Sequence, residues 1–399
     1  MKTAYIVDVL RTPIGKYGGA LASIRPDDLA ATVIRELMAR NTTIDPQVIE
    51  EVIFGAANQS GEDNRNVARM ALLLADLPES IGGVTVNRLC ASGLQAITQA
   101  AQGIQTNHGA AFIAGGVESM SRAPYVISKS TAGFTRNQEM ADTTIGWRFT
   151  NPELARRHYP YSMGETAENV AAKWNISRAE QDQFGLNSQE KYFRAESAGL
   201  FKDERIALTL HQGKTPVVIN TDEYPRKTTL EKLAALKPAF KADGTVTAGN
   251  ASGINDGAAA TLLANEDILK QFNLKPMARV VASAAAGVNP AFMGIGPVPA
   301  VRKALQRAGL SLKDIDLIEL NEAFAAQALA CIHDLQLNPE LVNVNGGAIA
   351  IGHPLGCSGV RITATLLHEL ARRKGRYGLA TMCVGVGQGV AVIYENLRR

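Results

Sequence analysis

Two stretches of this sequence repeat in register at a distance of 266 residues. Phe54 and Leu320 each close an apolar run of strand type, and Ser92 and Ser358 each stand at the start of a helical pattern. A strand end and a helix start that keep one offset indicate an internal duplication. The sequence therefore predicts two similar βαβαβ half-domains that pack face to face.

Strands and helices alternate in both halves. The first half has predicted strands at 5–10, 52–57, 84–86 and 112–117, helices at 26–40 and 67–75, and a further helix after residue 90. The second half has predicted strands at 278–286, 315–320, 379–384 and 389–394, and helices at 297–308, 322–335 and 355–373. This alternation predicts an α/β fold with parallel strand pairing.

Residues 121–244 have no counterpart in the repeat and are more polar than the rest. Helices are predicted at 166–174 and 178–196, the second with a capping box of Ser177 and Glu180, and a strand pair is expected around residues 216–222. So long an insertion with helices of its own predicts a cap over the active site. The expected division is a first half-domain (1–120 and 245–272), an inserted cap (121–244) and a second half-domain (273–399).

Composition and charge narrow the function classes. The chain has 399 residues, of which 46% are hydrophobic and 20% charged, and its net charge of +3 is too small to indicate nucleic-acid binding. The four cysteines lack the spacing of a zinc knuckle or a disulfide framework. Asp8 and Arg11 interrupt any signal-peptide core, and no apolar run has membrane-spanning length. We therefore expect a cytoplasmic protein with no nucleic-acid or membrane partner.

Cys90 stands at a strand-to-helix corner. The preceding run, 84–86, is of the β-branched type that suits a buried strand, and helical spacing follows the cysteine. The N-terminus of a helix favours an anion, which would lower the thiol pKa from about 8.5 towards or below 7. The alternative is that Cys90 is a small buried hydrophobe, as most free cysteines are.

Three later stretches carry further reactive residues. These are 321–324 (Asn-Glu-Ala-Phe), 346–356 with His353, and 382–389 with Cys383. The duplication places His353 at the start of the helix equivalent to the one that follows Cys90, so both residues should lie near a pseudo-twofold axis. A histidine within reach of a cysteine is the arrangement that activates a thiol nucleophile.

Seven motifs in order along nearly the whole chain resemble the thiolase family of acetyl-CoA C-acyltransferases. They occupy 11–15, 84–97, 115–121, 249–257, 321–324, 346–356 and 382–389. Ketoacyl synthases share the fold but usually present two histidines, whereas the second cysteine here, Cys383, is typical of thiolases. The resemblance implies duplicated half-domains in a layered α-β-α-β-α core with an inserted cap.

The family's catalytic roles transfer onto matching residues. By resemblance, Cys90 attacks an acyl thioester, His353 takes its proton, and Cys383 exchanges a proton with the α-carbon of acetyl-CoA. One oxyanion site would use His353 Nε2 and a water held by Asn321, and the other the backbone N–H groups of Cys90 and Gly385. The resemblance implies acyl-CoA substrates with CoA as a cosubstrate, no metal or redox cofactor, and a homotetramer or homodimer.

Other matched positions concern binding. By resemblance, Ser252 and Ala248 line the pantetheine tunnel, and the acyl pocket has walls at Met163, Phe324 and Met293. Arg226 matches a basic residue near the CoA phosphates, and its alternative is an ordinary surface arginine. Two departures from the family pattern are Ala91, where a glycine is common, and Ser162, where short-chain biosynthetic members often have histidine.

The substrate is suggested by two stretches, 61–66 and 142–149, which resemble those of 3-oxoadipyl-CoA thiolases. That substrate ends in a carboxylate, which needs a donor if it leaves water. We expect Arg148 to supply it, the alternative being a structural arginine that pairs with cap carboxylates. The alternative function is an acetoacetyl-CoA or broad-range 3-ketoacyl-CoA thiolase.

Two other interpretations of these residues are a metal site and a non-catalytic binding protein. A metal site of Cys90, His353, Cys383 and Cys357 is disfavoured because these residues lack short chelating spacing. A non-catalytic acyl-CoA-binding protein should have lost a catalytic residue, and none is missing. Cys331 is expected to be a packed helix residue and Glu322 to orient its loop, while Cys357 has no assigned role.

Overall fold

The computed structural model describes residues 2–130, 132–134, 136–210 and 215–399. Its strands form two halves whose order corresponds over four strands, and the first half has one more strand, β4, at its edge. The first half runs β1 (Tyr5–Arg11), β10 (Asn255–Ala264), β5 (Ala111–Ser119), β3 (Ile49–Gly55) and β4 (Gly82–Val86). The second runs β11 (Ala278–Gly287), β14 (Gln388–Asn396), β13 (Tyr377–Val384) and β12 (Leu317–Leu320). The halves join where β1 pairs with β11. This shared order confirms the predicted duplication.

Strand pairing is mixed, so the expectation of parallel pairing is only partly right. β3 is parallel to both β4 and β5, and β12 is parallel to β13. β10 and β14 run antiparallel to their neighbours. The turn between Val384 and Gln388 is too short for a crossover, so β13 and β14 can pair only as a hairpin.

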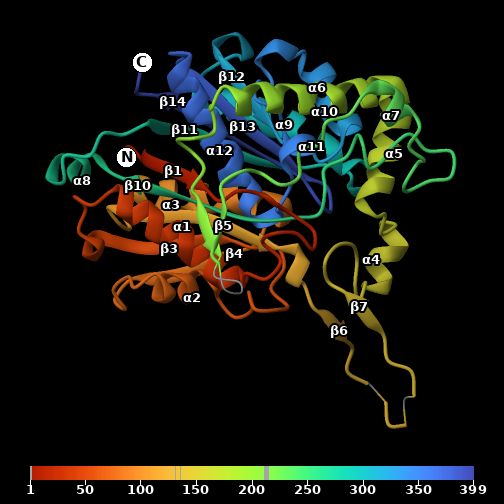
Figure 1. The fold of residues 1–399 in the computed structure, drawn as a ribbon, viewed down its shortest axis with the longest axis horizontal. Helices are drawn as coiled ribbons and strands as arrows, with labels where there is room; N and C mark the ends of the chain where they lie inside the picture. The colour runs from red at the N-terminus through yellow and green to blue at the C-terminus, as the bar shows by residue number, and fades with distance from the viewer. Residues whose placement is uncertain (1, 131, 135, 211–214) are drawn as a thin grey trace.

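Helices lie between and outside the two halves of the large sheet (Figure 1). The central layer is α3 (Ser92–Gln105) and α12 (Leu355–Arg372), and its side chains form one buried cluster with strand residues of both halves. The outer layers are α1 (Pro26–Arg40) and α2 (Val67–Leu74) on the first half, and α9 (Pro297–Ala308) and α10 (Ala325–Leu335) on the second. The layered α-β-α-β-α core is confirmed.

Helices α3 and α12 cross at glycines. A Cβ atom on Gly93 would lie 2.8 Å from the carbonyl oxygen of Gly356, and one on Gly359 would lie 2.2 Å from the backbone nitrogen of Leu94. The two backbones therefore approach more closely than residues with a Cβ allow. Because the contact lies near the start of both helices, it brings their N-termini together.

The insertion carries several short elements. They are β6 (Tyr125–Ile127), β7 (Met140–Asp142), α4 (Pro152–Arg157), α5 (Met163–Trp174), α6 (Arg178–Ser197), β8 (Leu208–Leu210), β9 (Val217–Ile219) and α7 (Leu230–Ala234). The predicted capping box of Ser177 and Glu180 is present at the start of α6. Strands β6 and β7 extend away from the body of the molecule (Figure 1). The limits of the three expected domains stay a prediction.

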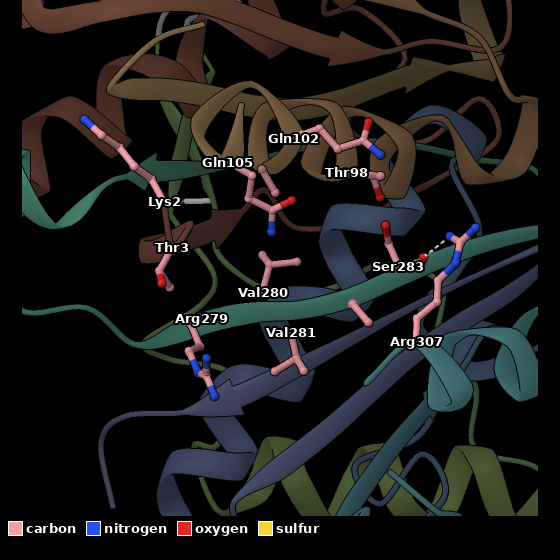
Figure 2. A pocket seen from close by; sticks show the side chains of 12 residues that line it. Lys2, Thr3, Thr98, Gln102, Gln105, Arg279, Val280, Val281, Ser283 and Arg307 are labelled. Carbon is pink, nitrogen blue, oxygen red and sulfur yellow. Dashed lines mark hydrogen bonds between the residues drawn. The ribbon is translucent and has the colours of Figure 1, made fainter. Parts of the chain in front are cut away.

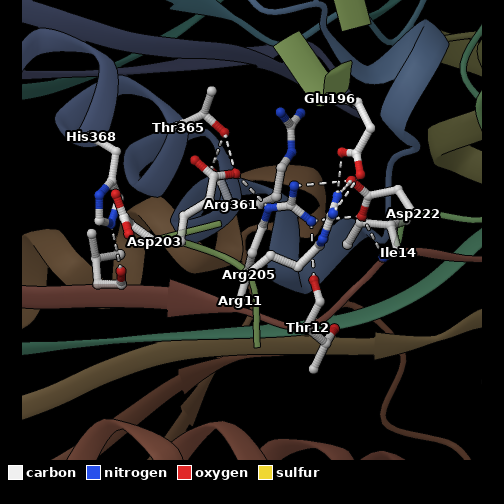
Figure 3. Close-up of polar contacts among 12 residues, drawn as sticks. Arg11, Thr12, Ile14, Glu196, Asp203, Arg205, Asp222, Arg361, Thr365 and His368 are labelled. Atoms are coloured by element: carbon white, nitrogen blue, oxygen red, sulfur yellow. Dashed lines mark hydrogen bonds and ion pairs between the residues drawn. The ribbon is translucent and has the colours of Figure 1, made fainter. Parts of the chain in front are cut away.

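A buried ion network ties the insertion to the core (Figure 3). Arg11, at the end of β1, donates to Glu204 at 2.7 Å and to Asp222 at 2.7 and 3.0 Å. Arg205 donates to Asp222 at 3.0 Å and to Glu196 at 2.7 Å. Removing one partner of such a network leaves a buried charge uncompensated, which typically costs about 3–5 kcal/mol. The insertion is therefore held firmly against the first strand.

Short elements complete the described chain: β2 (Gly15–Lys16), α8 (Glu266–Gln271) and α11 (Ala348–Ile351), with 3-10 turns at Pro46–Val48, Leu89–Ala91, Met120–Arg122, Pro290–Ile295, Leu312–Asp314 and Pro339–Leu341.

Two expectations about elements were wrong, and one strand was missed. β4 was expected to be buried, but among the described strands it pairs with β3 alone, at the sheet edge, and its residues are partly exposed. β10 was not predicted, because its run of glycine and alanine has little strand propensity. Helix α10 begins at Ala325 and not at Glu322, because the Glu322 side chain binds a neighbouring loop.

Candidate active site

Cys90 lies in the 3-10 turn Leu89–Ala91, directly before α3. The corner is fixed by Ser92, whose Oγ accepts from the Arg88 N–H at 2.9 Å and donates to the Leu89 carbonyl at 2.6 Å. Asn87 Oδ1 accepts from the Leu89 N–H at 2.8 Å, and Leu89 itself has a positive φ of 46°. The predicted strand-to-helix corner is present, and local side chains set its shape.

The expected lowering of the Cys90 pKa was wrong. Burial raises the pKa of this thiol to about 11, although the backbone N–H groups of Gly385 and of Cys90 itself face the sulfur and act in the opposite direction. A helix N-terminus contributes only about 0.3–1 kcal/mol to an anion at ordinary sites, and desolvation of a thiolate in this packed corner outweighs it. The resting form of Cys90 is therefore the thiol.

His353 follows α11 and Gly352, whose φ of 116° is one that a residue with a side chain rarely adopts. Its backbone N–H donates to Asn255 Oδ1 at 2.9 Å, and its ring Nδ1 lies 2.6 Å from Ser358 Oγ. Burial, and then the charge of Arg361, lowers the pKa of His353 to about 3. The imidazole is therefore neutral and able to accept a proton from a neighbour.

Asn321 directly follows β12 and faces the same ring. Its Nδ2 lies 3.4 Å from both ring nitrogens of His353, so it points at neither lone pair directly. Its Oδ1 faces Arg361 Nη2 at 3.5 Å. Because an arginine can only donate, this contact turns the amide nitrogen towards His353.

Cys383 lies at the end of β13 and is 1% exposed. Burial raises the pKa of its thiol well above the ordinary value, and the neighbouring thiols of Cys90 and Cys331 add to the rise. A Cβ atom on Gly385 would meet Leu89 Cδ1 at 3.1 Å and Met163 Sδ at 3.5 Å. Residues from both halves and from the insertion thus converge on Cys90 and Cys383.

The three residues expected to wall the acyl pocket share an apolar cluster with Cys383. Met293 and Phe324 are buried in it, and Met163 packs against it from the start of α5. The structure thus brings together residues that lie about 160 positions apart in the sequence.

The expected CoA-binding residues lie along one strip beside this cluster. Both the N–H and the Oγ of Ser252 donate to the Ala323 carbonyl, at 3.0 and 3.1 Å. Arg226 is exposed, stacks 4.9 Å above the Tyr224 ring and donates to the Ala248 carbonyl at 3.0 Å. Ala248 is exposed as well. An arginine held at the surface in this way presents its charge to a ligand.

Arg148 is half-buried and makes no hydrogen bond or ion pair with any residue that the structure describes. The alternative of a structural arginine paired with cap carboxylates is therefore not observed among these residues. The segment before it is anchored to the core, because Asn58 Nδ2 donates to the carbonyl and the hydroxyl of Thr143 at 3.1 and 3.0 Å. The same Asn58 donates its N–H to Glu118 at 2.9 Å.

Sequence reasoning missed two positioning groups. Glu118 is buried, which raises its pKa to about 7, and it accepts from the N–H groups of Ala57, Asn58 and Gly356. Ser358 touches His353, and the only sequence signal for it is its register with Ser92. Glu322 orients its loop as expected, because it accepts from Ser188, Asn343 and the Ile349 N–H.

A cavity of about 460 Å³ lies elsewhere, between α3 and β11 (Figure 2). Its basic residues are engaged: Arg307 donates to the Ser283 carbonyl at 2.6 Å, and Arg279 and Lys2 pair with Glu395 and Asp267. None of the expected site residues lines it.

Neither a cluster of metal ligands nor a membrane-crossing helix is present in the part of the chain that the structure describes. No group of three or more His, Cys, Asp or Glu side chains there is placed to hold a metal ion. None of the described helices combines the length and the apolar character needed to cross a membrane.

Comparison with known proteins gives strong matches over the full chain. Family models described as "Thiolase, N-terminal domain" and "Thiolase, C-terminal domain" match residues 4–267 and 274–396. A "Beta-ketoadipyl-CoA thiolase" of Escherichia coli is 56% identical over 401 residues, and one of Pseudomonas putida is 54% identical over 400, each covering 100% of both chains. The crystal structure of a Bacillus anthracis acetyl-CoA acetyltransferase has a TM-score of 0.93 at 44% identity, covering 100% of this chain and 99% of that one.

Proposed function

This chain belongs to the thiolase family of acyltransferases, and we propose that it cleaves 3-oxoadipyl-CoA with CoA to give succinyl-CoA and acetyl-CoA. The observation that carries the proposal is the full-length identity of 56% to a protein named for that substrate. It is supported by the placement of Cys90 and His353 just before or at the starts of two crossing helices and of Cys383 at the end of β13.

The first half of the reaction breaks the C2–C3 bond. The Cys90 thiol gives its proton to His353 Nε2, and its sulfur attacks the C3 carbonyl carbon. The resulting alkoxide collapses, the C2–C3 bond breaks, and its electron pair leaves as the enolate of acetyl-CoA. Cys383 gives its proton to C2 of this enolate, which leaves an acyl group on Cys90 and a thiolate on Cys383.

The second half transfers the acyl group to CoA. The CoA thiol gives its proton to the Cys383 thiolate and attacks the acyl carbon on Cys90. Cys90 leaves and takes back its proton from His353, so both cysteines are thiols again. Because Cys90 and His353 are neutral at rest, the proton moves only when the thiol meets substrate, which limits side reactions of a free thiolate.

Two oxyanions are served by different groups. The N–H groups of Gly385 and Cys90 face the nucleophilic sulfur, which suits them to the alkoxide that forms there. Protonated His353 and a water held by Asn321 would receive the enolate oxygen. Loss of one donor of this kind typically costs about 3 kcal/mol of barrier, or about a hundredfold in rate.

Arg148 is our proposed partner for the terminal carboxylate of the substrate. Its lack of a partner among the described residues leaves its donors available. Met163, Met293 and Phe324 would hold the carbon chain, Ser252 and Ala248 the pantetheine, and Arg226 the CoA phosphates. The residues 121–244 would then act as the cap that closes the pocket.

A second candidate is an acetoacetyl-CoA or broad-range thiolase, favoured by the similarity to the acetyl-CoA acetyltransferase structure. A thiolysis panel separates the two. We expect kcat/KM for 3-oxoadipyl-CoA to exceed that for acetoacetyl-CoA and for a long-chain 3-oxoacyl-CoA by at least about tenfold. Equal or reversed values would exclude the proposed specificity.

Arg148→Met tests the proposed carboxylate partner. It removes one charge-assisted hydrogen bond, so kcat/KM for 3-oxoadipyl-CoA should fall about tenfold or more while acetoacetyl-CoA is spared. The matched control is Arg156→Met, because Arg156 is an exposed cap arginine that pairs with Glu153. Equal losses on both substrates would assign Arg148 to cap structure alone.

An oligomer, either a homotetramer or a homodimer, is also part of the proposal. β4 presents an unpaired strand edge with half-buried Val84 and Val86, and such edges tend to pair with another strand. The β6–β7 hairpin carries exposed Tyr125, Ile127 and Met140. Sedimentation equilibrium should therefore give two or four copies. A monomer would exclude an interface at the β4 edge and at the β6–β7 hairpin.

Four free cysteines among the described residues also fit the expected cytoplasmic location.

A further inference from the structure

The hydroxyl of Ser358 makes two short contacts in the first turn of α12. Its Oγ lies 2.8 Å from the Pro354 carbonyl oxygen and 2.6 Å from His353 Nδ1. A carbonyl oxygen can only accept, so the contact with Pro354 uses the one proton of this hydroxyl. Oγ must then accept in its contact with His353, and the donor is Nδ1–H.

A second contact, from Asn321, is compatible with the same tautomer. Asn321 turns its Nδ2 towards His353 because its Oδ1 faces the donor-only guanidinium of Arg361. An amide NH2 can only donate, so the nitrogen that it favours is an unprotonated one. Asn321 Nδ2 is 3.4 Å from both ring nitrogens, so this contact does not itself choose between them; with Nδ1 protonated towards Ser358, the nitrogen left to accept is Nε2.

We propose that Ser358 is a positioning residue that holds His353 in its Nδ1–H tautomer and so keeps the Nε2 lone pair free for the proton of Cys90. The proposal rests on the proposed thiolase chemistry, in which Nε2 is the proton acceptor. After the transfer, the imidazolium keeps its Nδ1–H bond to Ser358 and presents Nε2–H to the enolate oxygen. In the other tautomer Nε2 would already carry a proton and could not take one.

The register of the repeat gives this hydroxyl a counterpart with a different task. Ser92 occupies the matching position in α3, where its Oγ also donates to a backbone carbonyl. It accepts from a backbone N–H, that of Arg88, and not from a side chain. Only the copy in α12 therefore acts on a titratable ring.

The test measures the tautomer directly. In enzyme with ring-15N histidine, without substrate, the signals of His353 are assigned by their loss in His353→Gln. We expect the shift of a protonated nitrogen at Nδ1 and of an unprotonated one at Nε2. A protonated Nε2 in the native enzyme overturns the proposal, and this arm needs no serine variant that folds.

The second arm uses Ser358→Ala, which keeps a good helix former in α12. Two changes are expected: a mixture of His353 tautomers, and slower alkylation of Cys90 by iodoacetamide at pH 7, by about tenfold to a hundredfold, as for the loss of one hydrogen bond to a charged group. If alkylation slows while the His353 tautomer stays the same, Ser358 has only a structural role and the proposal is overturned. The proposal is also overturned if neither the alkylation rate nor the tautomer changes.

The matched control is Thr363→Val on the same helix. Thr363 Oγ1 donates to the Gly359 carbonyl four residues back at 2.9 Å, as Ser358 does to Pro354, and contacts Tyr394 and no histidine. It should leave both the tautomer and the alkylation rate unchanged, and equal effects in the two variants overturn the proposal. The tautomer of His353 and the alkylation rate of Cys90 are both measured without acyl-CoA. A wrong substrate assignment in the thiolysis panel can therefore be distinguished from a wrong role for Ser358.

Discussion

The starts of α3 and α12 are the two regions whose comparison explains this protein best. The two helices share the 266-residue register at Ser92 and Ser358, and they cross at Gly93 and Gly359, although α12 begins at Leu355, three residues before its serine, whereas α3 begins at Ser92 itself. The start of α3 carries the half-buried Cys90 on a 3-10 turn, and the start of α12 is preceded by the buried His353. In α3 the serine fixes backbone, whereas in α12 it contacts the histidine ring.

The difference shows how a duplicated scaffold can acquire two chemical roles. The repeat supplies the same close helix crossing and the same hydroxyl to each half. What differs is the reactive residue near each hydroxyl. In the first half it is the Cys90 thiol, whose burial raises its pKa, and in the second it is the His353 imidazole, whose burial lowers its pKa. Burial disfavours the charged form of both groups, so the pair rests neutral.

The largest expected effect separates the two partners of Cys90. His353→Ala should slow both acylation of Cys90 by acetyl-CoA and exchange of the acetyl-CoA α-protons, each by about a thousandfold, because it serves both steps. Cys383→Ala should abolish the exchange and leave acylation largely intact. Intact-mass spectrometry measures the acyl adduct, and NMR in D2O measures the exchange. If His353→Ala slows only acylation or only α-proton exchange, His353 does not serve both steps.

The next effect concerns the helix crossing. Gly359→Ala would place Cβ 2.2 Å from the backbone nitrogen of Leu94, whereas Gly93→Ala would place it 2.8 Å from the Gly356 oxygen. Both overpack the crossing, which typically costs about 1–3 kcal/mol, and Gly359→Ala should lie at or above the upper end. Urea unfolding of both variants gives the comparison. Equal stability of Gly359→Ala and the wild type would mean that the helices do not touch at this point.

The smallest effect tests the protonation states at rest. Because burial raises the pKa of Cys90 to about 11, the part of the alkylation rate that comes from free thiolate, and not from proton transfer to His353, should rise about tenfold for each pH unit between 7 and 10. His353, with its pKa lowered to about 3, should add no inflection in that range. Alkylation of Cys90→Ser gives the background from the other cysteines. A plateau below pH 8 would show that the helix start outweighs burial after all.

Much of the fold follows from local sequence signals. The predicted helices 26–40 and 297–308 match α1 and α9 to the residue, since each has a proline at its start. Gly309, with a φ of 66°, also ends α9. β10 escaped prediction because its alanines and glycine have low strand propensity, and it is a strand because it lies between β1 and β5. Propensity yields to packing at such central positions.

The candidate site also combines features that the sequence predicts with features that depend on packing. Glycine-rich motifs and the 266-residue register singled out Cys90 and His353 in the sequence, and the roles expected for Asn321 and Cys383 came from the resemblance to thiolases. Their grouping with Met163 from the insertion needed the folded chain. Protonation also depended on tertiary structure, because a pKa reflects how much water the fold removes and which donors it aims at each atom. The sequence therefore determined which groups are expected to react, and only the packing of α3 against α12 decided how deeply they are buried and which donors and acceptors face them.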